Sequence, residues 1–292
     1  MISPYVRRRR LADELVRLRE TRGYSADRLA KEIGVARQRI SRLENGHVRP
    51  DLNETMKILD ALGVDGEQWT QLVTIAREAQ ERGWWESFAQ QMGPRQALYA
   101  NLEAGARAIR EYQLTFLPGL LQTPDFTAAR AEIDKADWAE NFDPARSVEA
   151  RAGRQRMLRR PGGPTYEVVI DESAVRRLAV PPHITADQLR HLAKVTAAEE
   201  KLTVRVLPLD AAIAGHSVPK SAFSIYQYPD AGDPVVVAVE TVTSVLVLAE
   251  PDEVSHYLTL YDCFKDAALS PQDTADLLTK AAEAMSPTRR NP

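Results

Sequence analysis

The side chains with the clearest chemistry lie within residues 37–45. In the major groove of DNA, a glutamine can form two hydrogen bonds with adenine, and an arginine can form two with guanine. If this segment is a helix, its polar side chains lie on the face opposite the apolar Ile40 and Leu43. The side chains predicted to contact bases are Arg37, Gln38, Arg39 and Arg42. The pattern therefore predicts a recognition helix.

The preceding residues predict the elements that would hold this helix. Leu11, Leu15 and Leu18 recur at helical spacing, and Gly23 would end that helix. Ser25 is a suitable N-cap for a second helix that would end at Gly34. The recognition helix would follow after two residues. A fourth helix, formed by Leu52, Ile58, Leu59 and Leu62, would close the bundle.

Phosphate contacts would fix such a bundle on DNA without reading its sequence. Hydroxyl, amide and basic side chains near the ends of the second and third helices are suited to this role. The predicted phosphate contacts are Ser25, Ser41, Asn45, His47 and Arg49.

Residues 25–46 resemble the helix-turn-helix of phage repressor and Cro-like regulators, the Xre family. The shared features are the small Ala30 where two helices would cross, the turn at Gly34, and Val35, Ile40 and Leu43 on the inner face. The resemblance implies an all-α, lambda-repressor-like bundle that binds double-stranded DNA.

The charge distribution agrees with DNA binding. The whole chain has a net charge of −3, but residues 1–50 carry thirteen Lys and Arg against six Asp and Glu. Residues 51–292 carry 25 against 35, so a basic segment precedes an acidic one. The run Arg7 to Arg10 is either an arm that follows the DNA backbone or a disordered solubilising tail.

A chain of 292 residues is expected to form more than one domain. We predict a multi-domain fold with the helix-turn-helix domain at 1–66, a helical linker at 67–83, a mixed α+β domain at 84–286 and a tail at 287–292. Strands are expected at 112–117, 166–170, 202–207, 222–228, 235–240 and 244–248. Helices are expected at 96–109, 126–136, 144–160, 172–179, 186–199, 252–269 and 272–285.

The larger segment, about 83–285, also resembles a family: actinobacterial Xre regulators with a C-terminal domain of unassigned function, DUF5753-like and often regarded as antitoxin-like. The motifs that carry the resemblance are Gly83-Trp84-Trp85, Leu102-Glu103-Ala104, Leu117 to Thr123, Arg151 to Gln155, Ile170-Asp171-Glu172 and Ala268-Leu269-Ser270. Lys220 departs from the family's usual glycine, which leaves the role of the loop around Ile213 to Lys220 open.

Four side chains of this segment are candidates for a ligand or partner surface: Trp84, Trp85, Arg151 and Arg154. The two tryptophans would either cap the domain core or join a ligand or dimer surface, because paired indoles are costly to expose. The arginines of 151–160 are either a solvated helix face or an anion or partner site. Pro118-Gly119 is either a chain reversal or the wall of a pocket.

Catalysis and metal binding find no support in the sequence. Cys263 is the only cysteine, and the five histidines show no metal-ligand spacing. No phosphate-binding loop or nucleophile elbow is present. We therefore expect neither an enzyme nor a cofactor, and we expect a cytoplasmic protein without a signal peptide or membrane span.

Three classes of function remain: a regulator that responds to a small ligand, an antitoxin-like DNA-binding protein that neutralises a small partner protein and autoregulates its operon, and a bifunctional enzyme and regulator. A single recognition helix reads few base pairs, so the first two predict a homodimer on an inverted-repeat operator, formed through the C-terminal domain.

Overall fold

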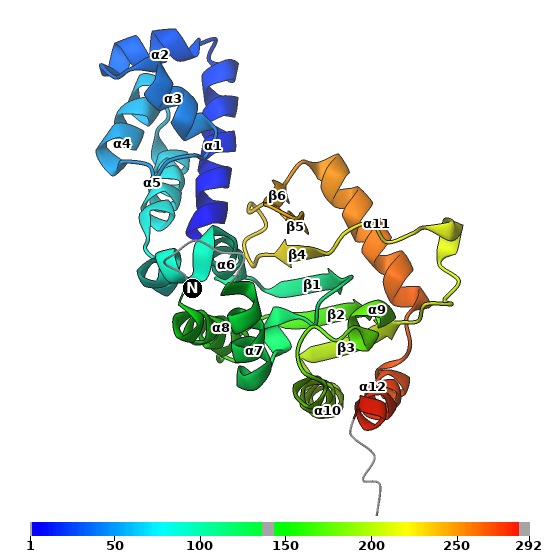
Figure 1. Ribbon diagram of the computed structural model, residues 1–292. Coiled ribbons are helices and arrows are strands. Elements are labelled where there is room, and N and C mark those ends of the chain that lie inside the picture. Colours follow the sequence, from blue (N-terminus) through cyan, green and yellow to red (C-terminus); the bar gives the residue numbers. More distant parts are fainter. Residues whose placement is uncertain (1, 136–142, 286–292) are drawn as a thin grey trace, which may run out of the picture. The chain divides into compact units, whose positions relative to one another are not determined.

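The chain forms two compact units. The computed structural model describes residues 2–135 and 143–285 (Figure 1). Unit 1 comprises Met1–Glu86 together with Tyr228–Pro234, and unit 2 comprises Ser87–Gln227 and Val235–Pro292. The predicted tail, 287–292, lies outside the described residues. The expected architecture, a helical helix-turn-helix region followed by a mixed α+β domain, is confirmed.

Unit 1 is a helical bundle. Its helices are α1 (Pro4–Thr21), α2 (Ala26–Ile33), α3 (Arg37–Glu44), α4 (Leu52–Ala61) and α5 (Gly66–Gln80), followed by the short 3-10 helix η1 (Trp84–Phe88). The core contains Leu11, Leu15 and Leu29 of the first two helices. Leu72 and Ile75 of α5 belong to the same core, so the segment suggested as a linker forms a helix packed in the bundle.

Side-chain caps determine where several of these helices begin. The Ser3 hydroxyl accepts a hydrogen bond from the Val6 amide, and Asp51 accepts one from the Glu54 amide. Each bond satisfies an amide that has no partner within the first helical turn. Because α1 begins at Pro4, the arginines from Arg7 onward are part of an ordered helix.

Unit 2 is built on one mixed sheet of six strands. The strands are β1 (Ala108–Gln113), β2 (Thr165–Asp171), β3 (Leu202–Leu207), β4 (Phe223–Gln227), β5 (Val236–Glu240) and β6 (Val245–Leu248). Their order is β3-β2-β1-β4-β5-β6. The first three strands are parallel, and β4, β5 and β6 continue the sheet in antiparallel pairs.

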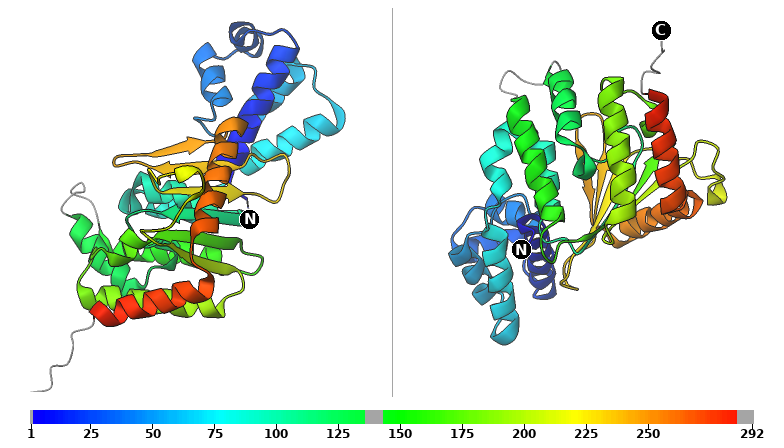
Figure 2. Two further views of the ribbon diagram at one scale, coloured as in Figure 1. Left: turned by 90° about the vertical axis from the view of Figure 1, so that its right-hand side faces the viewer. Right: turned by 90° about the horizontal axis from the view of Figure 1, so that it is seen from below.

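Helices cover both faces of this sheet. They are α6 (Ala89–Glu103), α7 (Pro124–Asp134), α8 (Pro144–Leu158), α9 (Glu172–Arg176), α10 (Pro182–Ala198), α11 (Pro251–Ala267) and α12 (Pro271–Met285), with 3-10 turns η2 (Gly119–Leu121) and η4 (Ala214–His216). Tyr261 and Phe264 of α11 pack on Tyr112 and Phe223 of the sheet. Figure 2 shows α11 on one side of the sheet and α8, α10 and α12 on the other.

The predicted position of the first strand was wrong. The sequence suggested a helix at 96–109 and a strand at 112–117, whereas α6 ends at Glu103 and β1 spans Ala108–Gln113. Gly105 has a φ of +76° and turns the chain between them. The strand then pairs with β2 from Ala108 onward, and this pairing with residues far along the chain sets its limits.

Candidate nucleic-acid interface

The turn between α2 and α3 is held by local contacts. The Ser25 hydroxyl accepts a hydrogen bond from the Arg28 amide at 3.1 Å and so begins α2. Gly34 ends the helix with a φ of +74°, a left-handed conformation in which a side chain would be strained. Ile40 and Leu43 anchor α3 in the bundle core. The opposite face of α3 is thereby turned away from the core.

Two side chains on that outer face have no intramolecular partner within the described residues. Gln38 and Arg42 are both exposed and lie four positions apart, so they project from the same face of α3. Ser41 and Asn45 are exposed beside them, and the Asn45 amide donates to the Ser41 carbonyl at 2.6 Å. The face therefore offers a free amide and a free guanidinium.

The two other predicted base contacts are engaged within unit 1. The Arg37 guanidinium lies 3.3 Å from Asp27, but both side chains are well exposed. Such a pair is weak in water and is readily exchanged for another partner. Arg39 is held more firmly, because Glu54 accepts hydrogen bonds from its Nε at 2.8 and 3.1 Å and raises its pKa. Arg39 thus joins α3 to α4.

The predicted phosphate contacts lie at several positions around α2 and α3. Ser25 and His47 are exposed, at the start of α2 and just after α3. Arg49 forms an ion pair with Glu86 of η1. Its charge is therefore already partly balanced within unit 1.

Neither prediction for Arg7 to Arg10 was correct, because these residues are neither a free arm nor a disordered tail. Arg7 and Arg10 are each only 8% exposed. Both donate to Asp230 and Asp233 of the segment Tyr228–Pro234, at 2.6–3.2 Å. The hydrogen bond from Arg7 holds the pKa of Asp230 well below its ordinary value. These arginines bind acidic side chains of unit 1.

The two candidate tryptophans belong to unit 1. Trp85 is buried, and its ring meets that of Trp84 edge to face with centroids 6.1 Å apart. A side chain on Gly83 would collide with the Trp85 ring, since its Cβ would lie 2.2 Å from ring atoms. Trp85 is thus buried in unit 1, whereas the sequence suggested that it caps the core of the C-terminal domain.

Arg154 lies in a buried polar cluster of unit 2, which corrects its assignment to an exposed surface. It is 6% exposed and donates to both carboxylate oxygens of Glu103. Although burial alone would lower the pKa of Arg154, the adjacent Glu103 raises it above its ordinary value. Its role is to pair α8 with α6.

Arg151 is partly buried one turn earlier on α8. Its guanidinium lies against Gly119, where an added Cβ would come within 1.9 Å of Nη1. Burial, together with the charge of Arg154, lowers the pKa of Arg151 to about 10. The motifs around Gly119 and Arg151, far apart in the sequence, thus pack together.

Sequence reasoning missed the acidic groups of the cluster around Arg154. Glu111 on β1 is buried and accepts hydrogen bonds from the Tyr166 hydroxyl and the Gln113 amide, both at 2.6 Å. Burial raises the pKa of Glu111 despite these bonds. The available signal was a glutamate two residues after Ile109 and next to Tyr112, both of which are buried.

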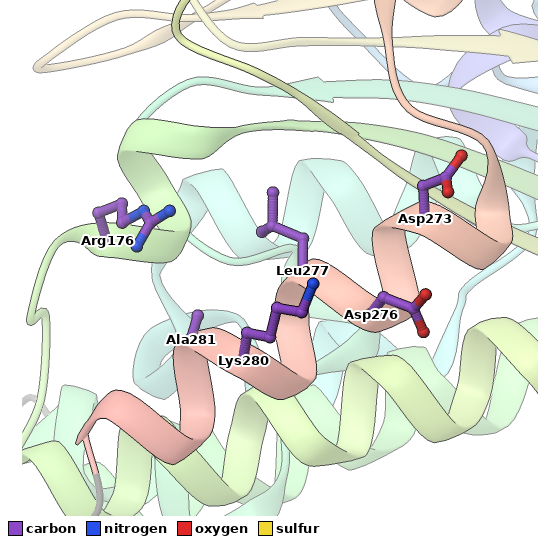
Figure 3. Close-up of a pocket in the computed structure, with 6 residues that line it drawn as sticks. All are labelled: Arg176, Asp273, Asp276, Leu277, Lys280 and Ala281. Atoms are coloured by element: carbon purple, nitrogen blue, oxygen red, sulfur yellow. The ribbon is translucent and has the colours of Figure 1, made fainter.

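An open hollow of about 370 Å³ lies between α9 and α12. Figure 3 shows that Arg176 comes from α9 and that Asp273, Asp276 and Lys280 come from α12. Arg176 is already bound to Glu172. The remaining charges are mixed in sign, so the hollow has no clear ligand preference.

Within the described residues, no group of three His, Cys, Asp or Glu side chains is placed to hold a metal ion. No helix in the same part of the chain is both long and apolar enough to cross a membrane.

The geometry of α2 and α3 is that of a DNA-binding transcriptional regulator. In agreement, a helix-turn-helix family model matches residues 15–69. A second model, described as a domain of unknown function (DUF5753), matches residues 96–280, and the chain belongs to this family. No curated protein and no solved structure matches the chain.

Proposed function

We propose that the protein is a homodimeric, sequence-specific regulator in which unit 1 reads an inverted-repeat operator and unit 2 responds to a small ligand. The observation that carries the DNA-reading role is the outer face of α3, opposite the buried Ile40 and Leu43. There Gln38 and Arg42 are exposed and have no partner among the residues that the structure describes. These two side chains can each make bidentate contacts with a purine.

The other candidate residues have supporting roles in this proposal. Arg37 leaves Asp27 and joins the base contacts, whereas Arg39 stays with Glu54 and fixes the angle of α3. Ser25, Ser41, Asn45 and His47 contact phosphates, because they are exposed near the ends of α2 and α3. Arg49 contributes less, because Glu86 already binds it.

Gln38→Ala is expected to weaken operator binding by about 1–3 kcal/mol and to leave nonspecific binding almost unchanged, because the amide reads a base edge. Operator and scrambled duplexes are titrated with each variant at one salt concentration. Gln71→Ala, which changes an exposed glutamine on α5, is the matched control. An equal loss on both duplexes would show that Gln38 does not read a base.

Dimerisation through the β6 edge is supported by a difference between the two edges of the sheet. The outer edge of β3 is covered, because the Val206 amide donates to the Thr274 hydroxyl and the Val206 carbonyl accepts from the Leu269 amide. In the described part of the chain, no backbone hydrogen bond covers the outer edge of β6. An uncovered edge strand is a template for pairing with another strand.

The β6 segment is also suited to pairing with its own copy. Residues 241–249 contain no charged side chain, so two antiparallel copies would bring no like charges together along this stretch. Leu246 is 52% exposed and Val242 is 96% exposed, so pairing would bury apolar surface. Antiparallel pairing of two β6 strands gives a dimer with two-fold symmetry. An inverted-repeat operator has the same symmetry.

Leu246→Lys is expected to convert the dimer to a monomer at micromolar concentration, because it places a charge at the centre of the paired strands. Light scattering of the full chain measures the change. Leu209→Lys, at another exposed leucine, should leave the dimer intact. A monomeric parent protein would refute the homodimer, which the ligand-responsive and the antitoxin-like functions both predict.

A further inference from the structure

A second hollow in unit 2 has a more defined chemistry. It has a volume of about 220 Å³ and is lined by Leu120–Pro124 together with Gln155, Arg159 and His191. Leu120–Pro124 belong to η2 and the start of α7, Gln155 and Arg159 lie in α8 and at its C-cap, and His191 lies in α10. Two of the motifs singled out in the sequence, Leu117 to Thr123 and Arg151 to Gln155, contribute to its wall.

Hydrogen bonds from two glutamines hold the wall of the hollow in place. The Gln155 amide donates to the carbonyls of Gln122 at 2.7 Å and Gly119 at 3.3 Å. From α10, Gln188 donates to the Leu121 carbonyl at 2.9 Å and accepts from the Thr123 amide at 2.6 Å. Because both glutamines bind the backbone of this turn, its shape is fixed before any ligand enters.

Two polar side chains of the wall keep hydrogen-bonding capacity. The imidazole of His191 is half-buried and has no hydrogen-bond partner within the described residues. Arg159 has one long contact, 3.5 Å from Glu199, and most donors of its guanidinium have no partner in the described part of the chain. The hollow therefore presents donors from two elements.

The electrostatic balance of the hollow favours an anion. Partial burial lowers the pKa of His191, and the positive charges of Arg159 and Lys194 lower it further, against the opposing effect of Glu199. At neutral pH the imidazole is thus uncharged and can donate one N–H, while Arg159 supplies the positive charge. The apolar part of the lining is Leu120, Leu121 and Pro124, and the polar part also includes Gln122, Thr123 and Gln155.

We propose that this hollow binds a small aliphatic carboxylate, with its carboxylate between Arg159 and His191 and its chain against Leu120, Leu121 and Pro124. A guanidinium matches the two oxygens of a carboxylate in a bidentate pair, which a neutral ligand of the same shape cannot form. The volume limits the ligand to a short chain. This assignment names the class of ligand to which unit 2 responds and so rests on that part of the proposed function. The binding measurements below test it separately from the reading of DNA.

Hexanoate is the probe for this proposal, with hexanamide as its neutral counterpart and inorganic phosphate as an anion without an apolar chain. Calorimetry with the full chain should show saturable binding of one hexanoate per chain. Hexanamide and phosphate should each bind at least about tenfold more weakly, because each lacks one of the two interactions. Equal binding of hexanamide or phosphate would overturn the carboxylate assignment, as would no hexanoate binding at about 10 mM.

Variants locate the binding within the protein. Arg159→Gln should weaken hexanoate binding by at least about tenfold, because a charge-assisted hydrogen bond is lost. Arg156→Gln, at an exposed arginine of α8 three residues before Arg159, should have no effect. Equal effects of the two variants would place the binding elsewhere.

A spectroscopic measurement tests the role of His191 without relying on affinity. In NMR titrations, hexanoate should raise the pKa of His191, because the bound anion stabilises the imidazolium next to Arg159, Lys194 and Glu199. An unchanged pKa at saturation would contradict the proposed position of the carboxylate.

Discussion

Replacing Arg154 with alanine is expected to lower the free energy of unfolding of unit 2 by about 3–5 kcal/mol, the loss typical of breaking a buried ion pair. Arg154 and Glu103 have side-chain exposures of 7% and 4%, so water cannot replace the missing partner. The variant leaves the Glu103 carboxylate buried in a cluster that already contains the carboxylate of Glu111.

Hydrogen exchange of the slowest amides of β1 and β2 measures this loss, because each of these strands has a neighbouring strand on both sides. Arg156→Ala, at an exposed position of the same helix, serves as the control. The double variant Arg154→Met and Glu103→Leu should regain part of the stability, since it leaves neither of the two charges unpaired. A loss below about 1 kcal/mol in the single variant would contradict the assignment of the pair.

The second large effect is expected in unit 1, at the ion pairs that Arg7 and Arg10 form with Asp230 and Asp233. Asp233→Ala should lower the free energy of unfolding of unit 1 by about 3 kcal/mol, because Arg7 and Arg10 would lose a buried partner. The side chain of Asp233 is 6% exposed, whereas that of Asp230 is 41% exposed. Asp230, which is open to solvent, and Glu78, which lies 2.9 Å from the Arg7 Nε, would compensate only partly.

Tryptophan fluorescence during urea unfolding reports this change, because Trp69, Trp84 and Trp85 all belong to unit 1. Asp210→Ala removes an exposed aspartate of unit 2 and should leave the transition unchanged. If the Asp233→Ala and Asp210→Ala variants unfold at the same urea concentration, the ion pairs of Asp233 with Arg7 and Arg10 contribute nothing to the stability of unit 1.

The helix-turn-helix could be predicted because its determinants are close together in the sequence. Two helices and the turn between them are specified by Ser25, by Gly34 and by the spacing of Ile40 and Leu43. Each of these signals acts on residues within about one helical turn of itself. Most strands of unit 2 were also found, because their apolar runs are bounded by turns. Both successes depend on local patterns.

The burial of charged residues could not be predicted from such patterns. Arg7 pairs with residues more than 220 positions away, and Arg154 pairs with a glutamate 51 positions before it. The local sequence around an arginine does not show whether its side chain faces solvent or pairs with a carboxylate far along the chain. The same holds for Arg39, whose partner Glu54 lies on another helix.

Tyr228–Pro234 belongs to unit 1 although it lies far from the helices in the sequence, and this limits how the domains of such regulators can recombine. The chain passes between the two units three times, after Glu86, after Gln227 and after Pro234. A recombination event with one crossover near residue 86 would transfer the helices but not Asp230 and Asp233. The new hybrid would inherit Arg10 without its acidic partners, and Arg7 with Glu78 alone, unless the recipient already carried the two aspartates. In this lineage, residues of the first helix and of the β4–β5 connection are therefore expected to be inherited and to change together.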